Sequence, residues 1–201
     1  MALFGGIRGP AIDDRDTLVV FLDEQAEAFA RSVVDDYTRA RARRDPEGLL
    51  ARPAMAAVLA TARAEAFPIA LTLVAEAIEA ALAPQAYDRA AQLHGLIGVA
   101  QAAFDRRPPS PAVTASAWNA ARAGVVRWLG AIMLRLPKTT DEMSDSLVGP
   151  MLAVMPIHDD LGRDDFPLLR GAMRAGLAAV RERFLASVNA PALAKALAAR
   201  Q

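Results

Sequence analysis

The chain contains no cysteine and only two histidines and two lysines among its 201 residues. The absence of cysteine excludes thiol catalysis, zinc–thiolate sites and iron–sulfur clusters, and it is compatible with either redox compartment. A surplus of one charge is also lacking, because 23 basic side chains balance 23 acidic ones. We therefore expect no nucleic-acid partner, since polyanion-binding proteins carry an excess of positive charge.

Long apolar runs are missing as well. The two most apolar stretches, 68–83 and 123–136, are shorter than a bilayer requires, and both contain charged residues. The N-terminus has no basic residue before its short apolar run, and Gly5, Gly6 and Pro10 do not fit a secretory signal. These features predict a cytoplasmic protein with no membrane span.

Recognisable catalytic signatures are absent too. The sequence has no phosphate-cradling glycine-rich loop, no ferritin-type Glu-x-x-His motif, no nucleophile elbow and no RNA-binding signature. Whether the protein uses a cofactor is unknown from the sequence, and no motif identifies a family. Function must therefore be inferred from individual residues.

Hydrophobic residues make up 54% of the chain, and apolar positions recur every three or four residues. We predict an all-α helical bundle of six to seven helices, with residues 1–12 as a flexible lead and residues 13–201 as one domain. No segment shows the alternation typical of a strand. The many alanines and arginines beside two lysines are typical of a G+C-rich genome, so we expect a bacterial source.

Helix boundaries follow from capping residues and prolines. The helix from 13 to about 40 is the most regular. In the region 53–83, Pro68 is expected to kink or split the helix. Further helices are expected over 85–106, 112–136, from 138 to a disruption at Gly149-Pro150, from 165 to 188 with Asp164 or Asp165 as its cap, and after Asn189.

The helices at 112–136 and 165–188 look apolar on nearly all sides, which predicts that they lie inside the bundle or that one faces a second subunit. Arg122 falls within the apolar stripe of the first, near Trp118. A buried guanidinium needs an acidic side chain, an aromatic face or an anionic ligand as its partner, unless the arginine side chain extends to the surface. Arg170, Arg174 and Arg181 share one flank of the second helix, where they edge its buried stripe.

His94 lies on a polar flank of the helix at 85–106 together with Tyr87, Gln101 and Asp105. Small residues between them leave space. Such a histidine could act as a general base, a metal or haem ligand or a pH-sensitive contact, and an ordinary half-exposed helix flank gives the same pattern.

An acidic cluster further along the chain contains His158 and Asp159. Together with His94 it raises the possibility of a metal-dependent hydrolase of the helical HD type, but the pair lies in an expected loop and lacks the distant helical aspartate.

Three classes of function remain. The leading hypothesis is a noncatalytic binding or regulatory protein that acts through protein contacts, with another protein or with copies of itself as a homo-oligomer. The second is a sensor or carrier with an interior pocket for a small, partly apolar anion, formed by Arg122, His94, Tyr87, Gln101 and Trp118. The third is the hydrolase.

Overall fold

The computed structural model describes residues 11–42, 47–48, 51–85, 88–108, 110–111, 113–132, 134–156 and 165–199. Within these ranges the chain forms α-helices and no strand, so the predicted all-α bundle is confirmed. The elements are α1 (Arg15–Ala42), α3 (Pro53–Leu82), the 3-10 turn η1 (Ala83–Gln85), α4 (Arg89–Asp105), α5 (Ala115–Ile132), α6 (Thr140–Ala153), α7 (Asp165–Ser187) and α8 (Ala190–Ala198).

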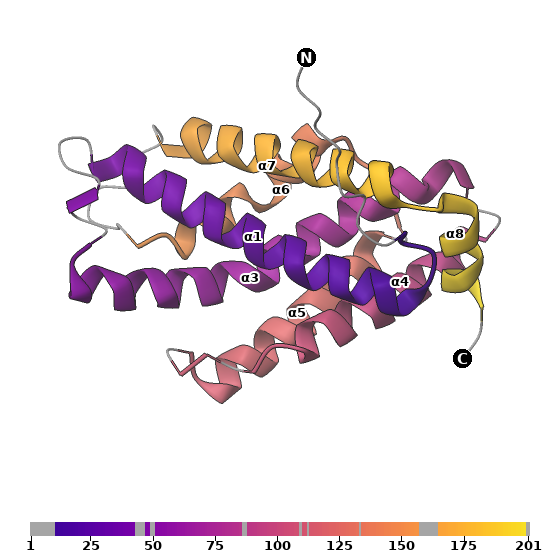
Figure 1. Cartoon of the computed structure of the whole chain (residues 1–201), viewed down its shortest axis with the longest axis horizontal. Helices are drawn as coiled ribbons and strands as arrows, with labels where there is room; N and C mark the ends of the chain where they lie inside the picture. The colour runs from indigo at the N-terminus through magenta and orange to yellow at the C-terminus, as the bar shows by residue number, and fades with distance from the viewer. Residues whose placement is uncertain are drawn as a thin grey trace, which may run out of the picture.

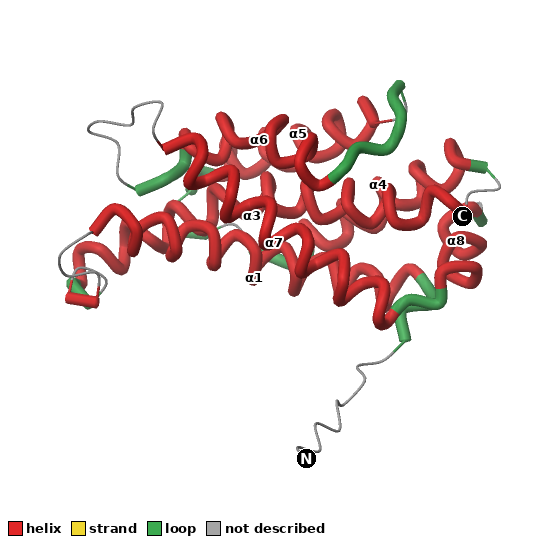
Figure 2. The backbone as a smooth tube through the Cα atoms, turned by 90° about the horizontal axis from the view of Figure 1, so that it is seen from above, coloured by secondary structure: helices red, strands yellow, loops and turns green. Residues whose placement is uncertain are grey.

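The long helices run side by side around α3 (Figure 1). α1 packs against α3 along much of its length, and α7 covers both of them. α5 and α7 lie on opposite sides of α3 (Figure 1). Figure 2 shows the short α8 closing one end of the bundle beside α4.

α3 is the central helix. From Ala66 to Glu79 every residue except the half-buried Ile69 is buried, and large apolar side chains lie on all sides of the helix. α3 runs unbroken through Pro68, so the expected split does not occur. The ring of Pro68 is buried within this segment, where contacts with neighbouring helices offset the hydrogen bond that a proline removes.

α3 also changes the expectation about membrane spans. With η1 it is the one helix in the described ranges that is long and apolar enough to cross a bilayer. The apolar stretch looked too short because we began it at Pro68, whereas the helix begins at Pro53. In the bundle, 72% of its most apolar 18-residue window is buried, which is typical of a central helix.

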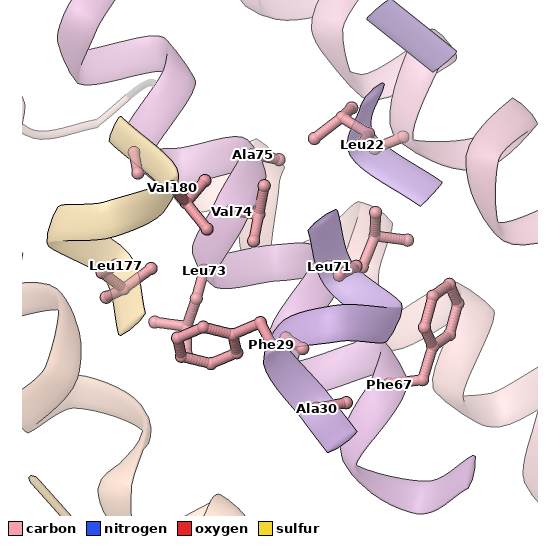
Figure 3. Packing of buried hydrophobic residues seen from close by; sticks show 14 of the residues in the cluster. Leu22, Phe29, Ala30, Phe67, Leu71, Leu73, Val74, Ala75, Leu177 and Val180 are labelled. Atoms are coloured by element: carbon pink, nitrogen blue, oxygen red, sulfur yellow. The ribbon is translucent and has the colours of Figure 1, made fainter. Parts of the chain in front are cut away.

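The core is formed by leucine, valine and phenylalanine side chains from facing helices. Figure 3 shows Leu177 and Val180 of α7 beside Leu73 and Val74 of α3, with Phe29 of α1 next to them. Gly176 permits this approach, since a Cβ atom there would lie 2.6 Å from the ring of Phe29. α1 and α7 can therefore pack closely over α3.

Most of the predicted helix ends are confirmed. Thr139 and Glu142 form a reciprocal capping box at the start of α6, and Asn189 caps α8 with its side chain. Gly149-Pro150 does not disrupt α6, which continues to Ala153. The cap expected at residue 164 lies outside the described residues.

The prediction that α5 and α7 both lie inside the bundle is wrong, and the alternative, that one of them faces a second subunit, stays a prediction. On α5 only Trp118, Val125, Leu129 and Ile132 are buried. The residues expected to cover the back of α7 are all exposed: Gly171, Ala175, Ala178 and Ala186. Alanine and glycine occur on buried and exposed faces alike, so they do not distinguish a surrounded helix from one covered on a single side.

The N-terminal part of the described chain joins α8. Ile12, which we assigned to the flexible lead, is buried and donates its backbone N–H to the carbonyl of Ser187 at 2.9 Å. Asn189 donates back to the carbonyl of Ile12 at 3.0 Å. The packed part of the chain therefore includes residue 12.

Candidate functional site

Arg122 does not project into the bundle. Its guanidinium forms two parallel hydrogen bonds of 2.7 Å with the carboxylate of Asp105 on α4, and the two side chains are 39% and 52% exposed. The hydrogen bonds from Arg122 hold the pKa of Asp105 below its usual range. Of the three partners considered for Arg122, the structure thus provides the acidic side chain, and the expected interior position is wrong.

Trp118 belongs to the core. Its ring lies 4.5 Å from that of Phe104 and stacks on Phe67 at 6.4 Å, measured between centroids. It is 8% exposed. This indole stabilises the junction of α3, α4 and α5 and lines none of the grooves described below.

The remaining predicted residues do not come together around Arg122. His94 is exposed near the end of α4 that contacts α8, and Gln101 is half-buried one turn before Asp105. Tyr87 lies outside the described residues. The described part of the chain therefore does not form an interior pocket from the predicted residues.

The interior instead holds carboxylates that sequence patterns did not single out. Glu76 of α3 is 1% exposed and lies 2.8 Å from the guanidinium of Arg135, while the indole N–H of Trp128 donates to it at 3.3 Å. One turn further, Glu79 pairs with Arg89 at 2.8 Å. These two ion pairs tie α3 to the start of α4 and to the segment that follows α5.

Two more buried carboxylates have arginine partners. Asp23 of α1 accepts from Arg107 at 2.5 Å and from Arg106 at 3.2 Å. Asp165, the first residue of α7, accepts from Arg41 at 2.6 Å and from Tyr37 at 3.3 Å. Burial raises the pKa of the Tyr37 hydroxyl. Each pair joins helices distant in sequence, which is a structural role.

The buried hydroxyls are also engaged. Thr38, Thr72 and Ser144 each donate to the carbonyl four residues earlier in their own helix, at 2.7 to 2.9 Å. Gln92 donates to the carbonyl of Ala194. Each buried polar residue named above therefore has at least one partner within the fold, while the amide oxygen of Gln25 and Oε2 of Glu79 are buried without a hydrogen bond to the described residues.

Within the described ranges no group of three or more histidine, aspartate or glutamate side chains could hold a metal ion. His158 and Asp159, on which the hydrolase hypothesis depends, lie outside them. The hypothesis stays a prediction without structural support.

The surface of the described residues includes several grooves, two of them larger than about 440 Å³, and one exposed helix face. A groove of about 970 Å³ separates α6 from α7, and its wall continues into the exposed outer face of α7. A second groove, of about 680 Å³, lies between the start of α1, α4 and the end of α8, and it contains His94. Sequence patterns missed both grooves, because each is formed by residues of helices that meet only in the folded chain.

Comparisons with protein-family models, with characterised proteins and with solved structures find no match for this chain. The geometry of the chain itself is therefore the basis for any functional assignment.

Proposed function

We propose that this chain is a noncatalytic binding protein that acts through protein contacts, and that it associates with a second copy of itself through the outer face of α7. The observation that carries the proposal is the composition of this face. Its exposed residues are mostly small or apolar: Leu168, Gly171, Ala175, Ala178, Leu185 and Ala186, with the charged Glu182 between Ala178 and Leu185.

The face is suited to close contact with another helix. A Cβ atom added at Gly171 would meet no other atom within 4 Å, so the space above it is open. At its edge toward α6, Phe166 is 42% exposed beside the groove. α7 has 23 residues, which gives a contact line of roughly 34 Å. The uncharged part of the face, formed by Leu168, Gly171, Ala175 and Ala178, is typical of protein interaction sites.

The charges beside the face favour a second copy as the partner. Arg170 and Arg174 of α7 pair with Asp145 and Asp141 of α6, and all four side chains are about half exposed. Further along α7, Arg181 and Glu182 add one charge of each sign. A twofold contact places each patch against an identical one, so equal numbers of both signs can pair across it. A patch of one sign would repel its copy.

The interior supports a noncatalytic role. A catalytic acid, base or nucleophile needs a polar group that is free to meet a substrate. In the described ranges the buried carboxylates are held by arginines and the buried hydroxyls by helix carbonyls.

Sedimentation velocity over a concentration series tests the association. We expect the wild type to sediment as a dimer and Ala175→Arg to sediment as a monomer, because a guanidinium at the centre of the face prevents close approach. Ala131→Arg is the matched control, since Ala131 is an exposed helical alanine on α5. It should remain dimeric.

Thermal unfolding followed by circular dichroism checks that both variants fold. Folded variants that both stay dimeric would show that α7 is not the interface. A wild type that is monomeric at every concentration would overturn the proposed self-association.

A further inference from the structure

The groove that contains His94 is formed at one end of the bundle by three helices. It has a volume of about 680 Å³, which lies in the range of small-molecule sites. α1 contributes Arg15, Asp16 and Val19, α4 contributes residues from 91 to 102, and α8 contributes residues 197–199. No residue of α6 or α7 lines it, so it is separate from the proposed dimer face.

Two glycines of α4 shape the groove. The backbone of α8 lies against Gly95, and an added Cβ atom would overlap the carbonyl of Leu197. Gly95 therefore allows α8 to form one wall. Gly98, one turn along, has no atom within 4 Å of an added Cβ. It leaves the space beside that wall open.

One polar group in the groove serves the fold. Arg15 donates from Nε to the carbonyl of Ala196 and from Nη2 to those of Leu197 and Ala199, at 2.6 to 3.0 Å. These bonds satisfy the carbonyls at the end of α8. The second amino group of Arg15, Nη1, makes no such bond to the described residues.

Two further polar groups are not engaged by hydrogen bonds or ion pairs of the fold, although Asp16 also places a negative charge in the first turn of α1. The side chains of Asp16 and His94 line the groove and have no hydrogen-bond or ion-pair partner within the described ranges. Among the described groups, they are the polar side chains of this groove whose interactions the fold does not use.

We propose that this groove binds a small zwitterion, a free amino acid with an apolar side chain. Its carboxylate meets Arg15 and His94, and its ammonium group meets Asp16. A simple anion would face the carboxylate of Asp16, and a simple cation would face the guanidinium of Arg15, so a ligand with both charges matches the lining best. Val19, Val99 and Leu197 provide an apolar wall for the side chain.

Titration of the ¹⁵N-labelled protein with three probes tests the ligand class. L-Leucine carries both charges, 4-methylpentanoate only the carboxylate, and 3-methylbutylamine only the ammonium group, on a similar branched body. We expect saturable shifts at the amides of Gly95 and Gly98 with L-leucine. The other two probes should bind at least about tenfold more weakly, since each lacks one charged hydrogen bond.

Variants locate the site. Gly98→Leu places a side chain in the groove, where its Cβ atom would meet nothing within 4 Å, and should abolish binding of L-leucine. Gly130→Leu on α5, where an added Cβ atom also meets nothing, should leave binding unchanged. Leucine favours helix more than glycine, so both variants should fold. Asp16→Asn should weaken L-leucine about tenfold and make it equal to 4-methylpentanoate.

Three results would overturn the proposal: no saturable shift with L-leucine, unchanged binding by Gly98→Leu, or equal binding of 4-methylpentanoate to the wild type. Ala175→Arg should bind L-leucine as the wild type does. The outcome is thus independent of whether the chain dimerises.

Discussion

α3 and α7 are both rich in alanine and apolar residues, yet α3 is surrounded by other helices and α7 is covered on one side only. The difference lies in where the large side chains are. On α3 they point in several directions, as Leu71, Leu73 and Val74 occupy consecutive faces of the helix. On α7 the buried side is lined by large residues and the outer side mainly by glycine and alanine.

Burial of large side chains stabilises a fold in proportion to the apolar area removed from water, whereas alanine contributes little wherever it lies. Because its large side chains are buried on all sides, α3 contributes strongly to the free energy of unfolding. α7 stabilises the fold with one face and leaves the other available for a partner.

Substitution of one leucine in each helix is the strongest test of this comparison. Leu73→Ala removes a fully buried side chain from α3 and should lower the free energy of unfolding by about 2–5 kcal/mol. Leu168→Ala on α7, where the side chain is 42% exposed, should cost less than about 1 kcal/mol. Urea unfolding measures both values, and similar losses would show that α7 is as deeply packed as α3.

A smaller change in the free energy of unfolding is expected when the arginine of a buried or of an exposed ion pair is replaced. Arg135→Ala leaves the carboxylate of Glu76 buried without its partner, which should destabilise the fold by about 3 kcal/mol. Arg122→Ala breaks an exposed pair and should cost less than about 1 kcal/mol.

Chemical denaturation of the two variants at one ionic strength provides the measurement. Equal losses would mean that Arg135 and Glu76 are not held together in solution.

The helices could largely be predicted from the sequence, because apolar spacing and capping residues act locally. The bounds of α1 and the start of α8 at the capping residue Asn189 follow from such signals. Pro68 and Pro150 could not be interpreted correctly, since a proline in a helix is tolerated only when packing with other helices compensates for it. That packing is a property of the folded chain.

The site was predicted only in part. His94 was singled out, and the structure places it in a groove, but its neighbours Arg15 and Asp16 come from the start of α1 and the far wall from α8. No local pattern connects these segments. Arg122 was placed inside the bundle because its position on α5 fits an apolar stripe. The buried stripe of α5 is narrower than the sequence indicates, so Arg122 lies at its edge and pairs there with Asp105 of α4.

The smallest predicted effect is the pH dependence of the stabilisation by the exposed Arg122–Asp105 ion pair. The bonds from Arg122 lower the pKa of Asp105 in the folded state below the ordinary aspartate value of about 4. The pair therefore stabilises the fold above that value, and its contribution is lost as the pH falls through the lowered pKa. Because both side chains are well exposed, the contribution near neutral pH should stay under about 1 kcal/mol. A double-mutant cycle with Arg122→Gln and Asp105→Asn, measured by urea unfolding from neutral to acidic pH, isolates this coupling. It should decline toward zero in acid, and a coupling energy that is constant with pH would show that the carboxylate of Asp105 does not pair with Arg122 in solution.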